Sequence, residues 1–271
     1  MALTFEELTR VRPVGEGVLV AEPAGEGPVL YGGLTMAIAL RAAASTLPAP
    51  MTPKSLHASF LRGGTWGPPL QVESDAVATG RTLATRRLTV RQEDRVVVTA
   101  TVSFHQPGDG EDWDVPATTA APALDGLAVL PTRFGVDVDV IEIRPAHDTT
   151  GRSTVETVHP YWARAHAPLP DDPVVHAAAL AFVSDYLVIH TPFRPGTTGA
   201  AGRWSTTIDH ALWFHRPVDA TDWLYWDAAC RSLTGGRYFT LGEVRDRRGA
   251  LVASLAQEGV VRAGARPAAS A

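Results

Sequence analysis

The chain has 271 residues, of which 45% are hydrophobic and 20% charged, a composition typical of one large globular domain or two of ordinary size. Its net charge of −5 at pH 7 argues against nucleic acid or an anionic membrane as a partner. The single cysteine, Cys230, excludes an intramolecular disulfide and a cysteine-rich metal site. The start lacks the pattern of a signal peptide, and the longest apolar runs are shorter than a membrane span, so we expect a cytoplasmic protein.

The first half predicts one buried helix followed by an antiparallel meander. Residues 33–45 follow a Gly-Gly pair and are apolar on nearly all sides, which is typical of a helix buried all round. Residues 70–78, 82–92 and 95–106 alternate apolar and polar side chains between short turns, which predicts three antiparallel strands. Residues 107–131 are rich in Pro, Gly, Asp and Ala without periodicity, and this composition indicates a linker.

The second half follows the same order. Residues 134–144 alternate, and Asp137 and Asp139 on one face favour a solvated surface over a metal site. Residues 172–189 begin with Asp-Pro, a helix-start signal, and predict a second buried helix. The tail after Arg262 is small and polar, and we expect it to fray. Four more strands are predicted at residues 206–215, 223–231, 238–245 and 251–261.

Matched segments relate the two halves at nearly constant spacing. They are Phe60–Arg62 with Phe214–Arg216 at an offset of 154, Gly80-Arg81 with Gly236-Arg237 at 156, and Thr101–Phe104 with Ser254–Gln257 at 153. Each half is a buried helix followed by a meander, so the pattern predicts a duplicated α+β fold. Two such sheets joined edge to edge would hide strand edges that otherwise invite aggregation.

Several common catalytic motifs are absent from the sequence. It has no Gly-x-Ser-x-Gly elbow, no phosphate loop, no Gly-x-Gly-x-x-Gly after a strand and no His-Glu-x-x-His. The nine histidines are scattered apart from His210 and His215, which favours core roles over metal binding. We therefore expect neither a metal nor a cofactor. Ser184-Asp185, which interrupts the second helix, indicates a buried hydrogen-bonded pair rather than a substrate contact.

An acid and an amide, Asp209 and Gln257, stand on two apolar strands near the end of the chain. Uninterrupted alternation places Asp209 on one face with Thr207, Ala211 and Trp213, and His210 on the other. The carboxylate could hold a water as general base, and the amide could orient that water without competing for its proton. From spacing alone this is evenly balanced against Asp209 capping a turn or pairing with an arginine such as Arg237.

The block that contains Asp209-His210, Trp213–Pro217 and Gln257–Gly259 resembles the acyl-CoA thioesterase II family. Tyr31–Leu34 and Ser55–Arg62 resemble the first repeat of that family, and the similarity covers about residues 30–106 and 180–262. The resemblance implies a double hot-dog fold, an α+β arrangement of two tandem repeats, each a buried helix wrapped by an antiparallel sheet. The repeats would occupy residues 1–110 and 133–262, with a linker at 111–132 and a frayed tail at 263–271.

The resemblance also implies hydrolysis of an acyl-CoA or acyl-carrier-protein thioester by a water held between an acid, a hydroxyl and an amide. Asp209 matches the acid and Gln257 the amide. The ungapped match puts Arg231 at the hydroxyl position, so that either Ser232 supplies the hydroxyl through a one-residue shift or the third member is missing. Arg231 could instead bind a carboxylate or phosphate of the substrate.

A backbone N–H at Gly32 or Gly33, at the start of the first helix, would stabilise the oxyanion, and a simple helix-entry turn is the other interpretation. The alternative function keeps the fold without hydrolysis, as a protein that binds or tailors a thioester or polyketide-like ligand. A hydratase is disfavoured because its Asp/His motif is not found. We also expect a homo-oligomer.

Overall fold

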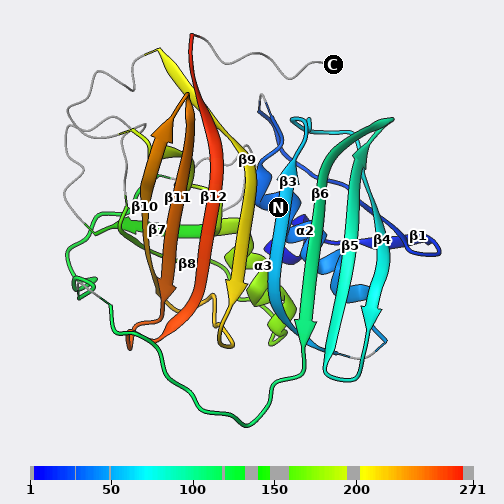
Figure 1. Ribbon diagram of the computed structural model, residues 1–271, viewed down its shortest axis with the longest axis horizontal. Helices are drawn as coiled ribbons and strands as arrows, with labels where there is room; N and C mark the ends of the chain where they lie inside the picture. Colours follow the sequence, from blue (N-terminus) through cyan, green and yellow to red (C-terminus); the bar gives the residue numbers. More distant parts are fainter. Residues whose placement is uncertain are drawn as a thin grey trace.

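A computed structural model describes residues 3–27, 29–48, 50–117, 120–131, 140–146, 159–193 and 202–264. Twelve strands of these residues form one sheet, and the two long helices lie side by side behind it (Figure 1). The sheet has the order β1-β2-β4-β5-β6-β3-β9-β12-β11-β10-β8-β7. Each repeat therefore supplies six consecutive strands of the sheet.

The elements of the first repeat are α1 (Phe5–Leu8), β1 (Arg12–Gly15), β2 (Val18–Ala21), α2 (Gly32–Ser45), β3 (Thr52–Phe60), β4 (Leu70–Thr79), β5 (Leu83–Gln92) and β6 (Arg95–His105). Those of the second are β7 (Ile141–Pro145), β8 (Tyr161–Ala165), α3 (Pro173–Ser184), the short 3-10 helix η1 (Val188–His190), β9 (Arg203–Phe214), β10 (Leu224–Thr234), β11 (Arg237–Arg245) and β12 (Leu251–Ala263).

The two repeats join along β3 and β9, which pair antiparallel from Ser55 opposite Trp213 to Ser59 opposite Asp209. The sheet is therefore continuous through the middle of the molecule. Both helices are buried on nearly all sides, because each has the sheet on one side and the other helix beside it. This arrangement confirms the double hot-dog fold. The proposed domain limits stay a prediction, and residues 134–139 of the expected strand at 134–144 lie outside the described part of the chain.

The second long helix is shorter than predicted. It begins as expected, with the Asp172 side chain accepting a hydrogen bond from the Val174 backbone N–H at 2.8 Å and Pro173 in the first turn. It ends at Ser184 rather than at Ile189, since Asp185 is the C-cap residue. The apolar stretch Pro173–His190 has the length and composition of a membrane span, but 67% of it is buried inside the protein, as expected for a core helix.

Both repeats carry a β-bulge at the same place. Between β3 and β6 the register shifts at Lys54, and between β9 and β12 it shifts at Ile208, which is 154 residues later. A bulge adds one residue to one strand and so reverses the alternation of faces beyond it. Thr207 consequently shares a face with His210, whereas uninterrupted alternation predicted that it shares a face with Asp209.

The segment between the repeats, predicted as a linker, lies against the second repeat where it is described. Its residue Asp114 pairs with Arg216 and with Arg245, and its carboxylate also accepts from the Leu251 backbone N–H at 3.2 Å. The indole of Trp162 donates to the carbonyl of Pro122 at 3.0 Å. The composition therefore indicated irregular structure correctly, but the segment is anchored by ion pairs rather than solvated along its length.

Candidate active site

A buried carboxylate lies where the two long helices meet. Asp185 follows the last residue of α3 and is 6% exposed. Asp185 lies at the beginning of α2, because the Tyr31 hydroxyl just before that helix donates to the carbonyl of Phe182 near the end of α3. The first turn of α2 has no side-chain cap of its own, and the Gly33 backbone N–H donates to the Asp185 carboxylate. The positive end of the α2 dipole thus faces this acid.

The two glycines that begin α2 allow this close approach. A Cβ on Gly32 would lie 2.7 Å from Asp185 Oδ2 and 3.0 Å from the Phe60 ring. A Cβ on Gly33 would lie 2.3 Å from the carbonyl oxygen of Phe182. Side chains at either position would therefore displace the acid or separate the helices.

A hydroxyl reaches the same carboxylate from the sheet. Thr207 Oγ1 donates to Asp185 Oδ1 at 3.0 Å. Thr207 is in β9 opposite Gly259 of β12, and it faces the helices because Ile208 is the extra residue of the bulge. The position of Gly259 has no room for a side chain, since a Cβ there would lie 2.4 Å from the Tyr238 hydroxyl.

An amide lies on the same face, on the neighbouring strand. Gln257 of β12 is fully buried and lies opposite His210 of the neighbouring strand β9. Its Oε1 is 2.8 Å from His210 Nδ1, and its Nε2 donates to the Tyr238 hydroxyl at 2.9 Å. His210 Nε2 is in turn 2.9 Å from the hydroxyl of Ser184, the residue before Asp185. Acid, hydroxyl and amide therefore belong to one connected cluster.

Burial dominates the electrostatics of the acid. It raises the pKa of Asp185 to about 7, although the hydrogen bonds from Thr207 and the Gly33 N–H act in the opposite direction. A carboxyl group with a pKa near the working pH can take up and release a proton during a reaction. Burial also lowers the pKa of His210 to about 4, although the hydrogen bond that the ring donates to Gln257 acts in the opposite direction, so the ring is neutral near pH 7.

The structure separates Asp209 from Gln257, so the predicted pair is wrong as a site for one water. Asp209 lies opposite Glu258 and Gln257 lies opposite His210, and neighbouring residues of a strand leave opposite faces. Gln257 points toward the helices, whereas Asp209 shares the other face with Glu258, which pairs with Arg237 at 2.9 Å. Burial first, and then the Glu258 charge, raise the pKa of Asp209.

Ser232 and Arg231 also lie away from the acid. Both are exposed on β10, which is separated from β9 by β12 and β11, or roughly 14 Å at the usual strand spacing. Arg231 is the extra residue of a bulge between Cys230 and Ser232. The hydroxyl contributed to the cluster is therefore that of Thr207, and no shift along β10 would bring Ser232 to it.

Two members of the cluster, Asp185 and Thr207, were missed as site residues. The signal for Asp185 was present, because an acid that interrupts an apolar helix needs partners if it is buried. The sequence indicates buried, hydrogen-bonded side chains there, and this is the environment observed for Ser184 and Asp185. Thr207 carried no such signal, since the bulge that turns it inward has no distinctive residue.

The corresponding position in the other half lacks this chemistry. The strand registers relate Gln257 to Val102, because Val102 faces Leu56 as Gln257 faces His210. This corrects the sequence match of Gln257 with Phe104 by two residues. The position of Thr207 beside its bulge corresponds to that of Pro53 beside Lys54. The C-cap of α2 is Thr46, where that of α3 is Asp185. The protein thus has one candidate site rather than two.

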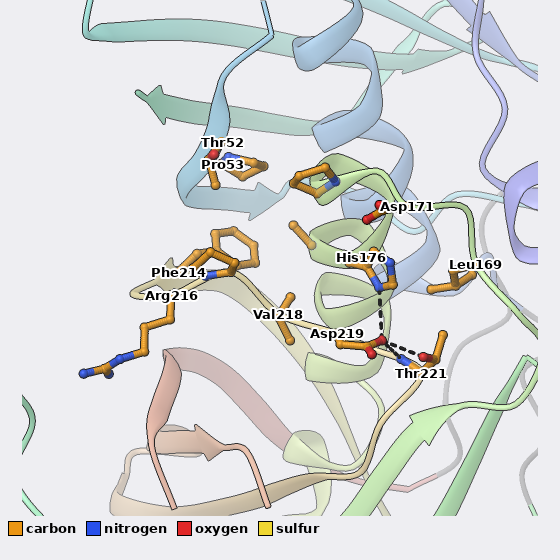
Figure 2. Close-up of a pocket in the computed structure, with 13 residues that line it drawn as sticks. Thr52, Pro53, Leu169, Asp171, His176, Phe214, Arg216, Val218, Asp219 and Thr221 are labelled. Atoms are coloured by element: carbon orange, nitrogen blue, oxygen red, sulfur yellow. Dashed lines mark hydrogen bonds and ion pairs between the residues drawn. The ribbon is translucent and has the colours of Figure 1, made fainter. Parts of the chain in front are cut away.

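A cavity of about 360 Å³ occupies that second position, beside the start of α3 (Figure 2). Pro53 and Phe214 line it, together with His176, whose Nδ1 is 3.7 Å from Asp219 Oδ1. His176 Nδ1 also accepts a hydrogen bond from the Ala220 N–H at 3.1 Å. The His176 ring therefore already contacts the Asp219 carboxylate and the Ala220 N–H. Among the described residues, no cluster of three or more His, Cys, Asp or Glu side chains could hold a metal ion.

Comparison with known proteins identifies the family. Residues 20–105 match the acyl-CoA thioesterase N-terminal domain and residues 107–261 match the acyl-CoA thioesterase C-terminal domain. The chain is 28% identical to acyl-CoA thioesterase 2 of Haemophilus influenzae over 251 residues, covering 86% of this chain and 87% of that protein. It is 24% identical to mouse acyl-coenzyme A thioesterase 8 over 256 residues, covering 86% of this chain and 80% of the relative.

Solved structures agree. The acyl-CoA thioesterase II TesB2 of Mycobacterium marinum superimposes with a TM-score of 0.79 at 27% identity, over 97% of this chain and 99% of that one. A tesB protein of Mycobacterium avium subspecies paratuberculosis gives a TM-score of 0.80 at 28% identity, over 95% and 98%. Because the matched domains together span most of the sequence in the right order, the chain belongs to the acyl-CoA thioesterase II family and is a thioester hydrolase with the double hot-dog fold.

Proposed function

We propose that this protein hydrolyses acyl-CoA thioesters with a water activated by Asp185, held by Thr207 and oriented by Gln257. The observation that carries the proposal is the buried Asp185 carboxylate, which accepts from Thr207 at 3.0 Å and has a pKa raised to about 7. A thioester is activated already, so a positioned water suffices and no covalent nucleophile is required. The names of the relatives support acyl-CoA as the substrate class.

In the proposed reaction Asp185 takes a proton from the water as the water oxygen bonds to the thioester carbonyl carbon. The carbon–sulfur bond then breaks, and the proton passes from Asp185 to the departing thiolate. The products are the free acid and coenzyme A. The hydroxyl of Thr207 holds the carboxylate in place, and an N–H of Gln257 binds the water oxygen without competing for its proton.

The oxyanion is assigned to the start of α2. The first four N–H groups of a helix have no partner within it, and the helix dipole favours negative charge there. One of them, the Gly33 N–H, is engaged by Asp185, and we assign the neighbouring Gly32 N–H to the oxyanion. A preorganised donor of this kind contributes roughly 3–4 kcal/mol to the transition state.

The decisive experiment compares two acid-to-amide variants by thiol release from acyl-CoAs of several chain lengths. Asp185→Asn should lower kcat by roughly 10²- to 10⁴-fold, the usual contribution of a general base. Asp209→Asn is the matched control on the other face of β9 and should turn over like the unmodified protein. Loss of turnover in the Asp209 variant alone would reject the assignment. No release from any acyl-CoA by the unmodified protein would favour the alternative, a binding or tailoring protein.

A further inference from the structure

A chain of buried polar groups connects the end of α3 with β12. Ser184 Oγ is 2.9 Å from His210 Nε2, His210 Nδ1 is 2.8 Å from Gln257 Oε1, and Gln257 Nε2 is 2.9 Å from the Tyr238 hydroxyl. Three of these four side chains, those of Ser184, His210 and Tyr238, are 1% exposed, and Gln257 is 0% exposed. Water cannot substitute for a lost partner at such positions without cost.

The hydrogen-bond partners determine which nitrogen and oxygen atoms of this chain carry protons. A carbonyl oxygen only accepts, so the contact between Gln257 Oε1 and His210 Nδ1 requires a proton on Nδ1. In the neutral ring Nε2 then accepts, and its donor is the Ser184 hydroxyl, whose single proton it shares with the carbonyl oxygen of Ala181 at 2.8 Å. The amide nitrogen of Gln257 is left with two protons, of which one goes to the Tyr238 oxygen. The second N–H has no acceptor within this chain of contacts.

We infer that His210 is a positioning residue for the hydrolysis: by donating from Nδ1 to Gln257 Oε1, it fixes the amide with an N–H directed to the attacking water. The inference rests on the proposed function, in which Gln257 orients that water. The opposite amide orientation would present a carbonyl oxygen, which would bind a proton of the water and compete with Asp185 for it.

Two features of the site support this assignment. Burial lowers the pKa of His210 to about 4, so the ring keeps one proton across the pH range in which Asp185 changes its charge. The groups that contact the ring are the neutral side chains of Ser184 and Gln257. His210 can therefore hold the amide without taking part in proton transfer itself.

The test measures kcat and KM for acyl-CoA hydrolysis in three folded variants. His210→Leu removes both contacts and should lower kcat by about 100-fold, the order expected for a misplaced catalytic group, with little change in KM. His210→Asn places an amide N–H near the position of Nδ1 and should recover most of that loss. His215→Leu is the matched control, because it removes a similar histidine–serine contact, His215 Nε2 to Ser254 Oγ at 2.9 Å, outside the cluster.

The inference is overturned if folded His210→Leu keeps the unmodified kcat, or if His210→Asn is no faster than His210→Leu. Nitrogen-15 NMR of the unmodified protein gives a reading that does not depend on any variant folding. A proton on Nδ1 supports the inference, and a proton on Nε2 rejects it. Asp185→Asn separates the two proposals: if it is inactive while His210→Leu is fully active, only the role of His210 fails, and if it is active, the proposed function fails.

Discussion

The hydroxyl of Thr207 donates to the carboxylate of Asp185 across 3.0 Å and so joins β9 to the end of α3. Among the residues that the structure describes, this is the only side-chain hydrogen bond between that carboxylate and the sheet. Their contact depends on the bulge at Ile208, since without it Thr207 would face away from the helices. The working geometry of the acid is therefore determined by an irregularity in a strand.

Replacing Thr207 should move the pH profile of hydrolysis. Its hydrogen bond lowers the pKa of Asp185, so Thr207→Val, which keeps the shape without the hydroxyl, should raise that pKa above about 7. The acid limb of kcat/KM against pH should then shift to higher pH, whereas Thr207→Ser should keep the original profile. Identical acid limbs in the Val variant and the unmodified protein would contradict the predicted link between the hydroxyl and the base.

The raised pKa of Asp185 also predicts a pH-dependent stability. Because the folded-state pKa is about 7 and the unfolded value is near 3.8, the folded protein binds the extra proton between these pH values. The part of the free energy of unfolding that the Asp185 carboxyl group contributes is thus lost as the pH rises from about 4 to about 7. Asp185→Asn cannot ionise, so it should gain stability relative to the unmodified protein over this window, by at most roughly 4 kcal/mol.

Urea unfolding of both proteins between pH 4 and pH 8 measures this difference. It should grow through the window and become constant above about pH 7. A difference in the free energy of unfolding that stays the same at every pH would show that Asp185 is not held in its protonated form by burial.

The two glycines of α2 should respond differently to alanine. In Gly33→Ala the new Cβ meets the Phe182 carbonyl at 2.3 Å, so the helices must separate, with a loss of stability of roughly 1–3 kcal/mol or more. In Gly32→Ala the nearest atom is Asp185 Oδ2 at 2.7 Å, a side-chain atom that can move. We therefore expect Gly32→Ala to lose turnover with a smaller loss of stability, as measured by thermal unfolding and thiol release in parallel.

The segment between the repeats should loosen when its anchor is removed. Asp114 faces Arg216 at 3.0 Å and Arg245 at 3.2 Å, and hydrogen bonding and these charges lower its pKa. Asp114→Asn should therefore increase the rate at which a protease cleaves within residues 107–117, with turnover unchanged. Asp109→Asn, at an exposed position of the same segment, is the control. Equal cleavage rates in the two variants would show that the ion pairs do not hold the segment.

The sequence predicted most of the architecture because the core elements have strong patterns. The helix at 33–45 and the strands 70–78, 82–92 and 95–106 agree with α2, β4, β5 and β6 to within a residue or so. The strands β1, β2, β3 and β8 were not predicted. Three of them have four or five residues, too few to establish a period, and β3 has its alternation interrupted by the bulge at Lys54.

The candidate site was harder to predict for a related reason. Gln257 was found because a buried amide among apolar residues stands out, and its role in orienting the water remains a prediction. Asp209 was predicted because the family resemblance favoured it, whereas spacing alone left its role evenly balanced. Pairing with Glu258 puts Asp209 on the face away from the helices, and the one-residue bulge at Ile208 turns Thr207 toward them, although no property of isoleucine marks a bulge. Pairing between distant strands decides which face a side chain occupies, and a single strand does not contain that information.

The bulge is present in both repeats, although only one of them has the acid, the hydroxyl and the amide. The same backbone shape is thus present in the first repeat, where Pro53 and Val102 stand in place of the hydroxyl and the amide. The shared bulge is a property of the repeating unit, and the side chains of the candidate site are the part that differs. Building a second centre would therefore require new side chains on an existing backbone rather than a new backbone.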